Sequence, residues 1–126
     1  MLSIVIATHG QLSYGLKNSF EMIIGESQHV YPVSLEEGID SFTSSTEKLI
    51  EDLLKEYEGI LVLTDLKGGT PYNVSLKQSF IHEDKVKVIA GVNLPMIIET
   101  SLILESSDLP SLTQKAVEFG QEAITD

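Results

Sequence analysis

The sequence contains no cysteine and few basic residues. Without cysteine, the chain forms neither disulfides nor thiolate metal sites. Its 8 basic side chains are outnumbered by 19 acidic ones, which gives a net charge of −11. Because this charge repels phosphate backbones, nucleic-acid binding is not expected. The charge favours encounter with a protein partner that has a basic face. The alternative is that it contributes only to solubility.

Long apolar runs are missing as well. No window approaches the length of a membrane span, and no basic segment precedes the first apolar run, so neither a transmembrane helix nor a signal peptide is expected. We therefore expect a cytoplasmic protein. With 126 residues, of which 42% are hydrophobic, the chain is predicted to fold as a single domain over residues 1–126.

Several familiar catalytic motifs are absent too. No Walker A pattern, dinucleotide glycine fingerprint or Gly-x-Ser-x-Gly nucleophile elbow is found. The first apolar run lacks the acidic pair with which a receiver domain binds magnesium. Three scattered histidines do not form a metal site, so we expect neither a metal ion nor a cofactor.

Apolar runs alternate with helical patterns along the whole chain. Strands are predicted at residues 4–7, 30–33, 60–63 and 86–90, and helices at 12–24, 39–57, 70–80, from 96 onward, and at 112–124 after a break at 106–110. This alternation predicts an α/β fold with a doubly wound parallel four-stranded sheet in the order 2-1-3-4, flanked by helices on both faces. Pro32 suits an edge position for the second strand.

The strongest candidate site lies where the winding of this sheet reverses. Ligands bind there outside the carboxyl ends of the strands, between the first and the third strand. His9 ends the first strand and Asp65 ends the third, so their side chains should meet. A carboxylate that accepts one imidazole proton leaves the other ring nitrogen free as a nucleophile or base. The alternatives are a histidine that closes a turn and an aspartate in an Asx-turn.

The residues around this pair suit a phosphoryl group. His9 lies beside a predicted helix N-terminus, whose amides attract anions. Gly10, Gly68 and Gly69 are the predicted phosphate-binding glycines, because glycine lets the backbone approach an anion and consecutive amides form an anion nest. Thr70, followed by proline, is predicted to cap the third helix and to donate its hydroxyl to a phosphoryl oxygen. A simple glycine turn is the alternative.

Other polar residues near this rim each have two possible roles. Lys67 attracts phosphate or is simply solvated, and Asn93 and Pro95 contact a ligand or form a turn. His29 and His82 lie at the edges of predicted elements with no evident partner, so we expect both at the surface.

Four motifs in this order resemble one known family. They are Ile4–Gly10 (IVIATHG), Glu21–Gly25 (EMIIG), Leu63–Asp65 with Gly68–Asn73 (LTD, GGTPYN), and Val88–Met96 (VIAGVNLPM). From the first strand through the fourth helix, the chain is similar to the IIA component of the mannose-family sugar phosphotransferase system (PTS).

The resemblance implies a phosphotransferase that works through a phosphohistidine. The histidine matching His9 accepts phosphate from the phosphocarrier protein HPr and passes it to a IIB component, which phosphorylates sugar entering through the IIC/IID membrane permease. The aspartate matching Asp65 hydrogen-bonds the imidazole, and the hydroxyl residue matching Thr70, often a serine, lies near the phosphoryl group.

The resemblance also implies a homodimer. Family members often exchange a C-terminal strand, but only Ala123–Asp126 follow the fifth predicted helix, so the mode of dimerisation stays open. Two other functions remain as alternatives. One is a related phosphocarrier that serves a regulatory protein or a dihydroxyacetone kinase, and the other is a non-catalytic module that binds a small anion.

Overall fold

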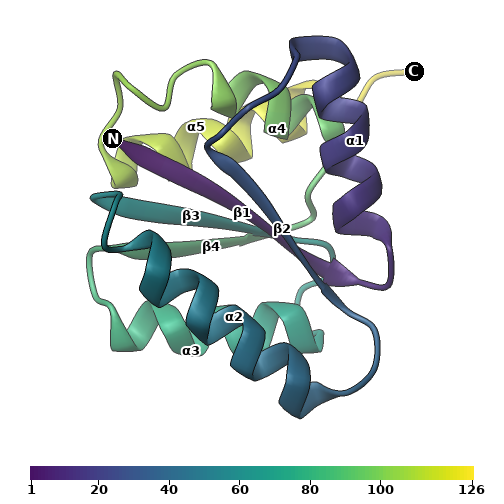
Figure 1. Ribbon diagram of the computed structural model, residues 1–126. Helices are drawn as coiled ribbons and strands as arrows, with labels where there is room; N and C mark the ends of the chain where they lie inside the picture. Colours follow the sequence, from purple (N-terminus) through teal and green to yellow (C-terminus); the bar gives the residue numbers. More distant parts are fainter.

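A computed structural model describes all residues, Met1–Asp126. Its elements in chain order are β1 (Leu2–His9), α1 (Leu12–Ile24), β2 (Val30–Leu35), α2 (Ile39–Leu53), β3 (Gly59–Thr64), α3 (Thr70–Ile81), β4 (Val86–Ala90), α4 (Leu94–Ser101) and α5 (Leu109–Glu122). The parallel strands lie in the order β2-β1-β3-β4. Helices α1, α4 and α5 cover one face of the sheet, and α2 and α3 cover the other (Figure 1). The predicted doubly wound fold and its strand order are confirmed.

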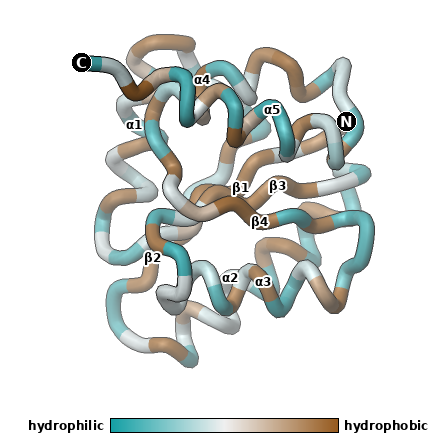
Figure 2. Tube along the Cα trace, turned by 180° about the vertical axis from the view of Figure 1, so that it is seen from behind, coloured by the Kyte–Doolittle hydropathy of each residue, from teal (hydrophilic) through white to brown (hydrophobic).

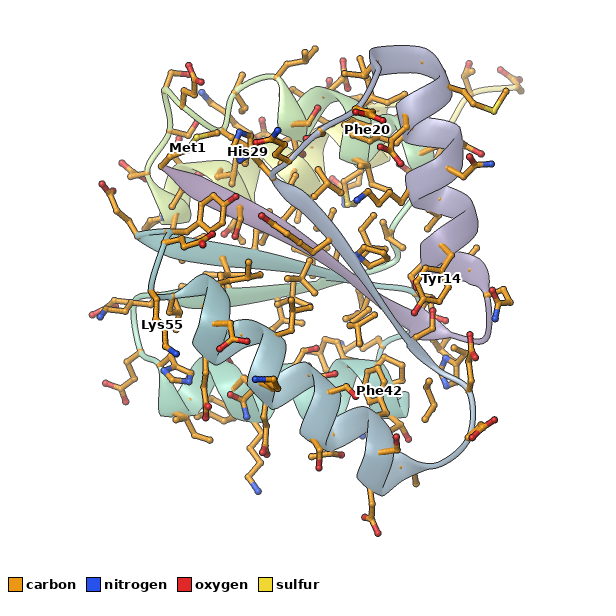
Figure 3. All side chains as sticks on the ribbon, viewed as in Figure 1. Met1, Tyr14, Phe20, His29, Phe42 and Lys55 are labelled. Atoms are coloured by element: carbon orange, nitrogen blue, oxygen red, sulfur yellow. The ribbon has the colours of Figure 1, made fainter.

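The two central strands are buried on both faces, which explains their continuous apolar sequences. Successive side chains of a strand point to opposite faces, so β1 and β3 each contribute to two cores. The strands accordingly form an apolar centre between the two helical layers (Figure 2). Phe20 of α1 and Phe42 of α2, both buried, anchor these layers on opposite sides of the sheet (Figure 3).

The outer strands are β2 and β4. Pro32 lies opposite Ile6 on the edge strand β2, where its missing N–H interrupts no second ladder, so the predicted edge position is confirmed. None of the helices combines the length and the apolar composition needed to cross a membrane.

Several predicted boundaries are wrong. Helix α2 ends at Leu53 and not at residue 57, and α5 begins at Leu109 and not at 112. The side chain of Asp108 accepts a hydrogen bond from the Ser111 amide at 2.8 Å and caps α5. Pro110 therefore lies in the first turn of this helix, where its missing N–H costs no hydrogen bond, and it does not interrupt the helix.

Candidate active site

His9 and Asp65 lie side by side at the carboxyl edge of the sheet. The pairing of β1 with β3 places Ala7 opposite Thr64, so His9 at the end of β1 and Asp65 just after β3 emerge together. Nδ1 of His9 lies 2.9 Å from Oδ2 of Asp65, and the same oxygen accepts the His9 backbone N–H at 3.0 Å. The other carboxylate oxygen, Oδ1, accepts the Leu66 amide at 3.0 Å. Asp65 thus closes its own turn and holds the histidine at two points.

The charge of Asp65 determines which ring nitrogen of His9 is free. Burial alone would raise the pKa of the Asp65 carboxyl, but the hydrogen bonds from the His9 ring and backbone outweigh it, so this pKa lies below its ordinary value. An ionised carboxylate only accepts hydrogen bonds, so Nδ1 of His9 carries the proton and a neutral ring presents an unprotonated Nε2. The His9 side chain is 46% exposed, against 16% for Asp65. The His9 ring is therefore the more accessible member of the pair.

Gly69 forms the wall against the imidazole. A Cβ atom placed on Gly69 would lie 2.8 Å from Cε1 and 3.4 Å from Nε2 of His9, so only glycine lets the loop approach the ring this closely. Gly68 adopts a φ of +81°, a conformation that L side chains rarely adopt. Gly68 therefore shapes the turn, whereas Gly69 makes room for the ring.

Helix α3 begins directly after this wall. Its N-cap is Gly69, so the prediction that Thr70 caps the helix is wrong, and Pro71 is the second helical residue. The hydroxyl of Thr70 accordingly forms no hydrogen bond within the chain. The backbone N–H groups of Gly68, Thr70 and Tyr72 have no acceptor either. Free amides at a helix N-terminus, together with a free hydroxyl, can bind an anion.

Two of the predicted phosphate-binding glycines use their own amides elsewhere. The Gly10 N–H donates to the Leu35 carbonyl at 2.9 Å, and the Gly69 N–H donates to the Leu66 carbonyl at 3.1 Å. These bonds shape the rim but leave neither amide free, so the contacts give no support to direct phosphate binding by them.

Thr8 is a structural residue that the sequence alone did not single out. Its buried hydroxyl accepts the Ser13 amide at 2.7 Å and thereby ties the start of α1 to the end of β1. The signal was a threonine between an apolar run and a helix, five residues before its partner. By fixing this turn, Thr8 holds the neighbouring His9 at the rim.

The rim also carries apolar surface. Leu12, at the start of α1, is 47% exposed, and Leu66, next to Asp65, is 61% exposed. Lys67 is exposed and forms no ion pair. No group of three or more His, Cys, Asp or Glu side chains is arranged to hold a metal ion. The rim thus offers an unprotonated imidazole nitrogen, free amides and apolar surface.

Asn93 and His29 form hydrogen bonds within the chain. Asn93 caps α4 by accepting the Met96 amide at 3.0 Å, and its side-chain amide donates to the Gly120 carbonyl at 3.0 Å. His29 lies at the opposite end of the sheet from Tyr14 (Figure 3). Its Nδ1 is 2.9 Å from the Tyr57 hydroxyl, so the expectation that His29 has no partner is wrong.

Comparison with known proteins identifies the family. Residues 3–117 match the family model EIIA-man, described as the PTS system fructose IIA component. The chain belongs to the mannose-family IIA components of the PTS. The PTS fructose-specific EIIA component of Bacillus subtilis is 35% identical over 98% of this chain and 84% of the relative. The mannose-specific EIIAB component of Escherichia coli K12 is also 35% identical over 98% of this chain, which spans 38% of that longer protein.

A solved IIA structure has the same fold. The EIIA component from Streptococcus agalactiae superposes with a TM-score of 0.89 at 32% identity and covers 100% of this chain and 97% of its own. The family resemblance seen in the sequence is therefore confirmed. As a PTS IIA component, the chain is a phosphotransfer protein of a sugar transport system.

Proposed function

We propose that the chain is a phosphohistidine carrier of a phosphoenolpyruvate-dependent sugar PTS, and that Nε2 of His9 accepts the phosphoryl group. The observation that carries this proposal is the contact between His9 Nδ1 and the ionised Asp65 at 2.9 Å. This contact leaves Nε2 unprotonated at an open rim beside the free amides of α3. HPr is the proposed donor and a IIB component the proposed acceptor, with a IIC/IID permease downstream and the cytoplasm as the proposed location.

The proposed transfer balances without a metal ion or a cofactor. The lone pair of His9 Nε2 attacks the phosphorus of phosphohistidine on HPr, the donor's P–N bond breaks, and its electron pair returns to the donor imidazole. The His9 ring becomes cationic because Nδ1 keeps its proton, and the carboxylate of Asp65 stabilises that charge. The Thr70 hydroxyl and the free amides of Thr70 and Tyr72 are proposed to receive the phosphoryl oxygens. Transfer to IIB is the same step in reverse.

Docking of two different partners requires an accessible site. His9 is 46% exposed, and Leu12 and Leu66 give its rim exposed apolar surface. The net charge of −11 favours encounter with basic protein faces. We further propose that residues 1–126 form one IIA domain and that two copies form a homodimer, which light scattering tests directly.

The decisive experiment is phosphoryl labelling. The chain is incubated with enzyme I, HPr and phosphoenolpyruvate labelled with ³²P, and we expect an acid-labile, base-stable label. His9→Ala should abolish the label while its circular dichroism spectrum stays that of the wild type, because the ring is half exposed and contributes little to the core. A wild-type chain that takes no label from phosphorylated HPr would refute the proposed function and favour a non-catalytic anion-binding module.

Purified acceptors distinguish the remaining alternative. The labelled chain should lose its phosphate when a mannose-family IIB component is added. Transfer to a regulatory protein or to a dihydroxyacetone kinase, with none to IIB, would establish the related phosphocarrier instead.

A further inference from the structure

One exposed side chain forms a hydrogen bond with the peptide between Gly68 and Gly69. We propose that Asn73, on the first turn of α3, is a positioning residue for phosphoryl transfer, because its side chain locks the glycine loop that packs against His9. This inference rests on the proposed function of His9. It concerns a residue that forms no hydrogen bond with the imidazole and, in the proposed transfer, none with the phosphoryl group.

The peptide between Gly68 and Gly69 is held at both of its polar ends. Nδ2 of Asn73 donates to the Gly68 carbonyl at 3.1 Å, and the Gly69 N–H donates to the Leu66 carbonyl at 3.1 Å. These two bonds point in opposite directions from one planar unit, so together they prevent the peptide from flipping. The backbone N–H of Asn73 also bonds the Gly69 carbonyl at 2.9 Å, which links the next peptide to the helix.

A restraint from outside is needed because two successive glycines do not fix their own conformation. Glycine populates positive and negative φ with similar ease, and Gly68 is held at +81°. Asn73 is exposed on a helix, where asparagine is a weak helix former and gains nothing from packing. Its hydrogen bond to the Gly68 carbonyl gives this residue a purpose that helix formation does not.

Movement of this peptide would be transmitted directly to the reacting nitrogen. The imidazole of His9 packs against the Cα of Gly69, and no side chain at residue 69 fits between them. The free N–H of Thr70 follows in the next peptide unit. A shift of the loop therefore changes both the ring position and the direction of the amide proposed to bind the phosphoryl group, and a displacement of about 1 Å can cost on the order of 10²-fold in rate.

The test compares two exposed helical asparagines. Asn73→Ala removes the donor to Gly68, whereas Asn18→Ala removes a side chain on α1 that makes no hydrogen bond in the chain. We expect Asn73→Ala to lower the rate of phosphorylation at saturating phosphorylated HPr about tenfold, with the KM for HPr within twofold of wild type. Asn18→Ala should leave both quantities unchanged.

A spectroscopic measurement separates positioning from general destabilisation. In ¹H–¹⁵N spectra of Asn73→Ala, the amide signals of Gly68, Gly69 and Thr70 and the His9 ring nitrogens should shift, while signals of α5 stay in place. Asn73→Asp keeps the size but loses the donor, so it should be slowed as well. A normal rate in both variants, or a loss confined to KM, overturns the inference while wild-type labelling still stands. An unlabelled wild type would refute the proposed function itself.

Discussion

The molecule holds two histidines at opposite ends of its sheet, and their surroundings differ in kind. His9 is the last residue of β1, at the edge where α1 and α3 begin, and its ring contacts a carboxylate. His29 precedes β2, and its ring contacts the Tyr57 hydroxyl, which also lies 3.0 Å from the Gln28 carbonyl. In a parallel sheet, the carboxyl edge collects helix N-termini with their free amides, whereas the amino edge collects helix C-termini with their carbonyls.

This difference supports the proposal that His9 takes part in phosphoryl transfer, whereas His29 contributes to stability. A phosphoryl group needs donors for its oxygens and an anion for the ring that becomes cationic, and the His9 end supplies both. At the other end, burial raises the pKa of Tyr57, with further contributions from its hydrogen bond to Tyr31 and from the charges of Tyr31 and Glu56, so this phenol stays neutral. Instead, an edge-to-face aromatic cluster forms at this end. The ring centroid of Tyr57 lies 5.8 Å from that of His29 and 6.1 Å from that of Tyr31.

The sharpest test of the comparison is the location of the phosphate. Mass spectrometry of the chain phosphorylated by HPr should place all phosphate on the peptide that contains His9. His29→Ala should keep full labelling, because that ring has no carboxylate partner and no free helix N-terminal amides. Phosphate on His29, or a loss of labelling in His29→Ala with the fold intact, would break the distinction between the two ends.

Asp65→Asn should give the next largest effect. The variant loses the charge that fixes the His9 tautomer and stabilises the phosphorylated ring, so we expect the transfer rate to fall on the order of 10²-fold. Asp108→Asn is the matched control, because asparagine caps a helix as well as aspartate does and α5 lies outside the site. Rapid-quench measurement of phosphorylation by HPr compares them, and equal rates would remove the role assigned to Asp65.

Topology made the His9–Asp65 pair predictable. In each case a single threonine separates the residue from the apolar run before it, and the alternation of strands with helices places the ends of two neighbouring strands at one edge of the sheet. The argument needs only strand order and direction, which short-range patterns determine. The contact was therefore predictable although the two residues lie 56 positions apart in the sequence.

Contacts that depend on exact backbone direction were not predictable. Thr70 was predicted to be the helix cap, but the cap lies one residue earlier, because Gly69 takes the extended conformation of an N-cap, with φ −74° and ψ 167°. The bond between His29 and Tyr57 joins a loop to a residue that follows α2, and no periodicity marks such a pair. Glycine dihedral angles and loop contacts are set by tertiary packing, so the sequence alone left these features open.

Gly69→Ala tests the closeness of the wall at the His9 end. Because the added Cβ would lie 2.8 Å from Cε1 of His9 and 3.2 Å from the Leu66 carbonyl oxygen, the ring or the loop must shift. We expect phosphorylation by HPr to slow about tenfold. Gly15→Ala, on an exposed turn of α1 with no atom within 4 Å of the new Cβ, should not slow it. An unaltered rate in Gly69→Ala would show that the ring position tolerates the added methyl group.

Tyr57→Phe tests the other end, where we expect a change in stability and none in transfer. The variant loses the hydroxyl that contacts His29 at 2.9 Å, Tyr31 at 2.8 Å and the Gln28 carbonyl at 3.0 Å. Loss of this hydroxyl should lower the free energy of unfolding by about 1 kcal/mol, measured by urea titration. The phosphorylation rate should equal that of the wild type, and a slower rate would couple the two ends of the sheet.

The smallest expected effect is the acid dependence of the Asp65 contribution. Because the folded-state pKa of Asp65 lies below its value of about 3.9 in an unfolded chain, the ionised carboxylate stabilises the fold fully above that value. This contribution is lost as the pH falls through the lowered folded-state pKa. The difference in unfolding free energy between wild type and Asp65→Asn should therefore be constant near pH 5 and shrink as the pH approaches 3. Urea titrations at each pH measure it, and a difference that grows toward acid would mean that Asp65 folds in its protonated form.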